Sequence, residues 1–74
     1  MARLPELPAR RVLTVLFRAG FTEVRRSGSH RFLAHPDGRT MVFALHHAER
    51  VRPKLLAKIL KDARMRAEEF RNLL

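Results

Sequence analysis

The sequence contains no cysteine, tyrosine or tryptophan. Without cysteine the chain has neither a disulfide nor a thiolate metal site, and nothing in it requires an oxidising compartment. Without tyrosine or tryptophan it lacks two of the side chains on which nucleic-acid bases stack. No segment approaches the ~20 apolar residues of a membrane span, and Met1 to Pro8 carries charges and prolines where a signal peptide needs an apolar run. These absences predict a cytoplasmic protein with no membrane partner.

Acidic residues are also few, with seven Asp and Glu against sixteen Lys and Arg, a net charge of +9 and a pI near 11.8. So much positive charge favours a polyanionic partner, because binding phosphates releases counterions. A two-metal nuclease is not expected, since the only adjacent carboxylates, Glu68 and Glu69, lie near the C-terminus. His46 and His47 lack a third ligand for zinc. The sequence predicts no metal and no small-molecule cofactor, but charge alone does not separate an RNA enzyme from a nucleic-acid binder or a merely solubilising surface.

The hydrophobic pattern predicts one α+β domain over residues 1–74. Pro8 suits the first turn of a helix that ends at Gly20, where a left-handed cap lets Phe21 fold back onto the last turn. The expected strands are 21–26, 29–35 and 40–46, a second helix starts at Pro53, and a short C-terminal helix is anchored by Phe70, Leu73 and Leu74. The order is α-β-β-β-α with a three-stranded antiparallel sheet packed on helices, followed by the short helix.

The second and third strands are expected to pair symmetrically about Asp37 and Gly38, so that paired residue numbers sum to ~75. This register places one set of residues against the helices: His30, Phe32, Ala34, Met41, Phe43 and Leu45. The other face, toward solvent, comprises Ser29, Arg31, Leu33, His35, Thr40, Val42, Ala44 and His46. Phe32 and Phe43 are therefore predicted to pack in the core, not to stack on bases.

In the second helix the expected apolar side consists of Leu55, Leu56, Ile59, Leu60 and Ala63. Lys54, Lys58 and Lys61 recur at helical spacing on the opposite side and are expected to face water. Such a stripe suits RNA phosphates, although an ordinary solvated helix face has the same pattern.

The residues with the clearest chemistry are Gly28, Ser29 and His30. RNA cleavage through the ribose 2′-hydroxyl needs a base for its proton and cationic donors for the phosphorane, and histidine suits the first task because its pKa is about 6.5. Gly28 allows close approach of backbone to phosphate, and Ser29 supplies a hydroxyl. Arg25, Arg26 and Arg31 offer forked donors for phosphate oxygens. His46 is only a secondary candidate, for the general acid or for substrate contact, because the expected register points it through the opposite face of the sheet from His30. Its neighbour His47 ranks below it.

Several short motifs occur in a particular order: Gly20-Phe21, Arg25-Arg26-Ser27-Gly28-Ser29-His30, His35-Pro36-Asp37-Gly38, a strand ending in His46, Leu56 with Ile59-Leu60, and Glu69-Phe70. Together they resemble the HicA messenger-RNA interferase toxins, the YcfA-like family, over nearly the whole chain. The resemblance implies a double-stranded-RNA-binding-like fold, ribonuclease activity against messenger RNA, and a HicB-type antitoxin as partner. It also implies that His30 is the catalytic histidine.

The chain departs from the family pattern at three places. Phe43-Ala44-Leu45-His46 stands where the family usually has Val-Pro-x-His, so the proline is absent. Lys54 replaces the glycine that usually precedes the first leucine of the second helix, and Arg64 replaces the glycine that often ends that helix. These changes affect local backbone shape more than the chemistry at His30.

Three hypotheses follow from the sequence. The first is a metal-independent endoribonuclease toxin with His30 as general acid or base. The second is a non-catalytic RNA-binding module of the same fold, in which His30 is structural. The third is an interaction protein whose basic surface binds only an acidic protein, a role that overlaps with antitoxin binding.

Overall fold

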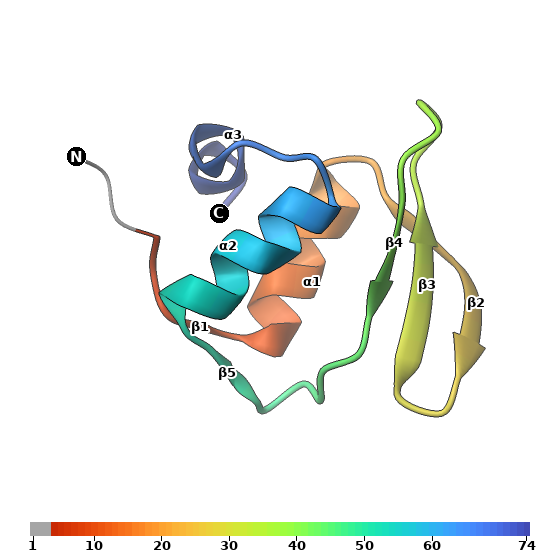
Figure 1. Ribbon diagram of the computed structural model, residues 1–74, viewed down its shortest axis with the longest axis horizontal. Helices are drawn as coiled ribbons and strands as arrows, with labels where there is room; N and C mark the ends of the chain where they lie inside the picture. The colour runs from red at the N-terminus through yellow and green to blue at the C-terminus, as the bar shows by residue number, and fades with distance from the viewer. Residues whose placement is uncertain (1–3) are drawn as a thin grey trace.

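The computed structural model describes residues 4–74, so the first three residues of the predicted domain lie outside the described range. The elements in chain order are β1 (Leu7–Pro8), α1 (Ala9–Arg18), β2 (Thr22–Ser27), β3 (His30–Ala34), β4 (Thr40–Phe43), β5 (Arg50–Val51), α2 (Pro53–Asp62) and α3 (Ala67–Asn72). Figure 1 shows α1 and α2 in the middle of the view, the sheet β2-β3-β4 on one side and α3 on the other. This layout confirms the predicted α+β fold. No helix within the described part of the chain is long and apolar enough to cross a membrane.

Helix α1 has the predicted amphipathic character, and its buried face comprises Ala9, Val12, Leu13, Val15 and Leu16. Pro8 precedes the helix as its N-cap, with φ −67° and ψ 149°. At the other end Gly20 has φ +112°, the N–H of Phe21 donates to the carbonyl of Leu16 at 3.1 Å, and the N–H of Gly20 donates to that of Phe17 at 3.0 Å. These two hydrogen bonds form a Schellman motif, which confirms the predicted cap and buries Phe21.

Helix α2 buries Leu56, Ile59 and Leu60, as predicted, but Leu55 is 36% exposed, so its place on the apolar side was wrong. The helix ends in the same motif as α1: the N–H of Met65 donates to the carbonyl of Leu60 at 2.8 Å, and Arg64 has φ +52°. An arginine therefore takes the left-handed conformation that glycine usually occupies.

Helix α3 closes the core, as predicted, by burying Phe70. Leu73 packs against the edge of the core. Leu74 is 37% exposed, so it is not the third anchor that the sequence suggested.

The register of the β3–β4 hairpin differs from the prediction by one residue. Leu33 pairs with Met41, and Phe32 pairs with Val42. The N–H of Gly38 donates to the carbonyl of His35 at 2.9 Å, the N–H of His35 donates to the carbonyl of Arg39 at 2.8 Å, and Gly38 has φ +100°. The loop therefore has three residues instead of two, with the glycine in the left-handed position that such loops need. Asp37 stabilises this loop, because its carboxylate accepts hydrogen bonds from the backbone N–H and the guanidinium of Arg39. The same two hydrogen bonds hold the pKa of the Asp37 carboxyl below 3.8.

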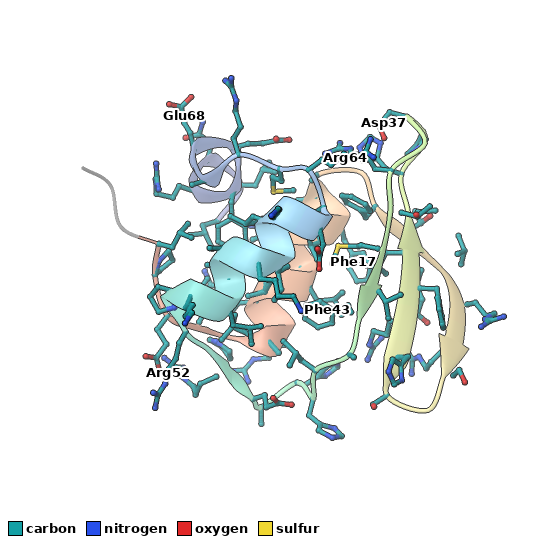
Figure 2. All side chains as sticks on the ribbon, viewed as in Figure 1. Phe17, Asp37, Phe43, Arg52, Arg64 and Glu68 are labelled. Atoms are coloured by element: carbon teal, nitrogen blue, oxygen red, sulfur yellow. The ribbon has the colours of Figure 1, made fainter. Side chains whose placement is uncertain are left out.

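A slip of one residue moves each side chain of a strand to the other face of the sheet. Leu33 is buried beside Met41 and Phe43, whereas Phe32 is only half-buried and His30 is exposed. Figure 2 shows Phe43 directed from β4 toward the helices. The predicted inward placement of His30, Phe32 and Ala34 was wrong, and so was the outward placement of Leu33.

The strand bounds also differ from the prediction. β3 ends at Ala34, and β4 ends at Phe43 instead of His46. Beyond β4 the chain turns, with the N–H of Glu49 donating to the carbonyl of His46 at 3.0 Å. It then forms the short ribbon of β1 and β5, in which Leu7 pairs with Val51. The sequence analysis did not predict this ribbon.

Candidate nucleic-acid interface

The β2–β3 hairpin turns at Gly28 and Ser29, and Ser27 pairs with His30 at its end. Gly28 has φ +60°, while Ser29 does not adopt a positive φ. This combination is typical of a type II′ turn, which needs glycine at its first central position. A Cβ on Gly28 would meet no atom within 4 Å, so the backbone of the turn is open to a ligand.

One side of this turn is hollowed into a groove of about 340 Å³. It is lined by Arg26, Gly28, Ser29, Arg31, Leu45, His46 and His47. The groove therefore brings together five residues that the sequence analysis nominated: Arg26, Gly28, Ser29, Arg31 and His46. Two guanidinium groups and two imidazoles around an open hollow make a cationic and donor-rich surface that suits phosphate oxygens.

Glu23 holds both arginines of the groove in place. Its carboxylate accepts from Nη1 of Arg31 at 2.8 Å and from Nε of Arg26 at 3.1 Å. Hydrogen bonds from Arg26 first, and from Arg31 second, hold the pKa of Glu23 below 4.5. At neutral pH the carboxylate is thus ionised, which fixes the two guanidinium groups while leaving further N–H donors for a phosphate.

The second nitrogen of the Arg31 guanidinium, Nη2, lies 2.8 Å from Nε2 of His47. A guanidinium only donates, so Nε2 accepts and the ring proton of His47 lies on Nδ1 in this arrangement. The sequence analysis ranked His47 below His46 as a candidate for acid or substrate contact. The sequence feature that could have indicated a turn here is Glu49, two residues after His47. In the structure its carboxylate accepts a hydrogen bond from the N–H of His46 at 3.0 Å.

His30 is exposed and lies at the start of β3, outside the set of residues that line the groove. By strand alternation its side chain shares a sheet face with Phe32, whereas Arg31 points to the groove side. Arg25 pairs with Phe32, so it is the nominated arginine on the face of His30. The structure therefore divides the nominated residues between the two sides of one hairpin.

Lys54, Lys58 and Lys61 are all exposed on α2, which confirms that the stripe faces solvent. They lie on a different element from the hairpin, and Lys58 lines a small hollow with Val42 and Leu45 beside β4. None of the three lysines lines the groove itself, but Leu45 lines both hollows, so the Lys58 end of the stripe lies next to the groove. Within residues 4–74 no three His, Asp or Glu side chains gather into a group suited to a metal ion.

The fold and the charge define a small, strongly basic α+β domain. The family model for the HicA toxin of bacterial toxin-antitoxin systems matches residues 9–65, which include α1, the whole sheet and α2. The chain belongs to the HicA toxin family, and its role is that of a toxin in a toxin-antitoxin system. A comparison with curated proteins found no match.

Proposed function

We propose that this toxin is a metal-independent endoribonuclease that cleaves messenger RNA, with His30 as the general base. The observation that carries the proposal is the position of His30, exposed at the end of a hairpin whose two sides also present Arg25, Arg26 and Arg31. A solvent-exposed imidazole can accept the proton of a ribose hydroxyl, and the arginines of the same hairpin can neutralise the charge that develops on the phosphate. Membership of the HicA toxin family supports the same reaction.

In the proposed reaction the neutral imidazole of His30 accepts the proton of a ribose 2′-hydroxyl. The 2′-oxygen then bonds to the adjacent phosphorus, and the bond from phosphorus to the 5′-oxygen of the next nucleotide breaks. Water protonates the leaving oxygen, so the products are a 2′,3′-cyclic phosphate and a free 5′-hydroxyl. A positioned base of this kind contributes about 10²- to 10⁴-fold to a rate.

The arginines bind and position the RNA backbone. Arg26 and Arg31 hold a phosphate in the groove together with the open backbone at Gly28 and the hydroxyl of Ser29, and His46 is a secondary contact there. Arg25 neutralises charge on the face of His30. Lys54, Lys58 and Lys61 bind phosphates further along the chain of the RNA.

The partners follow from the same charge. The proposed protein partner is a HicB-like antitoxin that is acidic where it covers the hairpin, because complementary potential both attracts and holds an inhibitor of a basic enzyme. The whole chain, residues 1–74, acts as one domain in this proposal. We place it in the cytoplasm, where messenger RNA is found.

One observation favours a second candidate, a non-catalytic RNA-binding module. Among residues 4–74 no side-chain hydrogen bond holds the ring of His30, whereas catalytic imidazoles are often oriented by a partner. In this alternative the groove and the lysine stripe bind RNA, and His30 only ends the strand.

Cleavage in the presence of EDTA separates the two candidates. We expect purified wild-type protein to fragment messenger RNA, and His30→Ala to bind the same RNA while cutting it at least a hundredfold more slowly. If both proteins bind and neither cuts, the module is correct. If neither binds at physiological salt, the basic surface serves a protein partner.

A further inference from the structure

The outer face of the sheet, away from the helices, carries an apolar patch beside His30. Val24 is 64% exposed and Val42 is 46% exposed, and both line a hollow of about 430 Å³ with Phe32 and Thr40. Val24 is the extra residue of a bulge, since Glu23 pairs with Leu33 and Arg25 already pairs with Phe32. The bulge therefore leaves Val24 without a cross-strand partner at the edge of the patch.

Phe32 lies at the centre of this patch, and its ring contacts a cation. The guanidinium carbon of Arg25 lies 4.4 Å from the centre of the Phe32 ring. His30 is two residues away on the same strand and the same face, which is a separation of about 7 Å along the strand. An aromatic ring, an arginine and the proposed catalytic imidazole thus form one row on an open sheet.

We propose that Phe32, flanked by Val24 and Val42, is a platform on which one base of single-stranded RNA stacks, next to the phosphate cleaved at His30. This rests on the proposed ribonuclease function and adds a base-binding subsite to it. Stacking on aromatic side chains of a sheet is a general way in which proteins hold unpaired bases, and Phe32 is half-buried between the more exposed Val24 and Val42. The exposed contact between Arg25 and Phe32 is weak, so a base displaces the guanidinium, which then binds the phosphate of the same nucleotide.

The charges on this face favour RNA over a second copy of the chain. No outward-facing strand residue within the described part of the chain is acidic, because Glu23 points to the groove side. A two-fold contact through Phe32 would bring Arg25 of both copies together in a chain of net charge +9. A ligand with an aromatic face and a phosphate satisfies both the ring and the cation.

The test measures binding of an uncleavable ligand, 2′-O-methyl hexaadenylate, by four proteins: wild type, Phe32→Leu, Phe32→Tyr and Phe17→Leu. Phe17 is a matched control, because it is 42% exposed but lies on α1. Stacking of one base predicts that Phe32→Leu weakens binding between about fivefold and a hundredfold, while Phe32→Tyr and Phe17→Leu stay within about twofold of wild type. The salt dependence should be the same for all four.

A second ligand with the same backbone but no bases makes the result specific to stacking. Wild type should bind the base-free ligand more weakly than hexaadenylate, by at least the factor by which Phe32→Leu weakens hexaadenylate binding. Phe32→Leu and wild type should bind the base-free ligand with equal affinity. Equal binding of the two ligands by wild type, or equal hexaadenylate binding by Phe32→Leu and Phe17→Leu, overturns the platform and leaves the ribonuclease proposal standing.

Two further outcomes would overturn the stacking platform. A wild-type dimer in sedimentation that Phe32→Leu abolishes shows that the patch is a protein interface and overturns the inference. Wild-type protein that binds neither ligand nor messenger RNA overturns the platform together with the proposed function.

Discussion

Nη2 of Arg31 and Nε2 of His47 lie 2.8 Å apart and join β3 to the turn that follows β4. On its other side the same guanidinium is held by Glu23, whose Oε1 lies 2.8 Å from Nη1. The side chain of Arg31 is 17% exposed, so it has few alternative positions. Arg31 is therefore set in the groove by an acceptor on each side.

His47 is then a positioning residue for Arg31. His47→Ala should lower kcat/KM for RNA cleavage by about threefold to tenfold, because the guanidinium loses one of its acceptors and its fixed position. His47→Gln should retain most of the activity, since its side-chain oxygen can accept the same hydrogen bond. Cleavage by His47→Gln that is as slow as by His47→Ala contradicts this role.

The ion pairs of Glu23 predict a pH dependence of stability. Arg26 and Arg31 hold the pKa of Glu23 in the folded state below its usual value of 4.5. A pKa that is lower in the folded state stabilises the fold above the unfolded pKa, and this stabilisation is lost as pH falls through the folded value. Glu23→Gln should therefore be less stable than wild type at pH 7, and the difference should shrink below pH ~4.5. Urea unfolding of both proteins across this range measures it, and a difference that is constant with pH is the contrary result.

The ring of His35 packs closely against the backbone of Gly20. A Cβ on Gly20 would lie 2.6 Å from Nε2 of His35, which is 2.8 Å from the carbonyl of Ala19. Gly38 has a similar φ, +100° against +112°, but open space around it. Both Gly20→Ala and Gly38→Ala should destabilise the protein by about 1–3 kcal/mol through backbone strain, and Gly20→Ala should cost at least about 1 kcal/mol more. Equal unfolding free energies for the two variants would show that His35 moves aside freely.

Arg64 occupies a left-handed position at φ +52°. Glycine relieves that strain but gains entropy in the unfolded chain, so Arg64→Gly should stabilise the protein by about 0.5–1 kcal/mol. In a domain of this size the melting temperature should rise by roughly 2–8 °C. The hydrogen bond from Nη1 of Arg39 to the carbonyl of residue 64, at 3.3 Å, involves only backbone there and should survive. The same guanidinium donates through Nε to the carboxylate of Asp37 at 2.8 Å, so Arg39 connects the end of α2 to the tip of the hairpin; Figure 2 labels Arg64 and Asp37. A lower melting temperature would show that the arginine side chain itself stabilises the fold.

The order of elements was predictable because each helix has an apolar stripe and ends at a recognisable residue. Gly20 followed by Phe21 is a cap that sequence alone identifies, and the structure has it. The ribbon of β1 and β5 was not predictable, because each strand has two residues and neither has an alternating pattern.

The register of β3 and β4 was the main error, and its cause is local. Asp37 and Gly38 suggest a two-residue loop, but Pro36 takes a central position in the turn and extends the loop to three residues. The shift exchanges Phe32 for Leu33 in the core and places His30 on the solvent face. His47 was ranked too low because the predicted strand ran to His46, whereas β4 ends at Phe43 and the turn that follows brings His47 to Arg31.

The account depends most on His30 as a base acting on a ribose hydroxyl. The direct measurement is the rate at which RNA fragments with 2′,3′-cyclic phosphate ends form in EDTA, for wild type and for His30→Ala at equal RNA occupancy. The account predicts cyclic phosphate ends from wild type and a rate at least about a hundredfold lower for His30→Ala. Cleavage by His30→Ala at the wild-type rate, or products without cyclic phosphate ends, would contradict it.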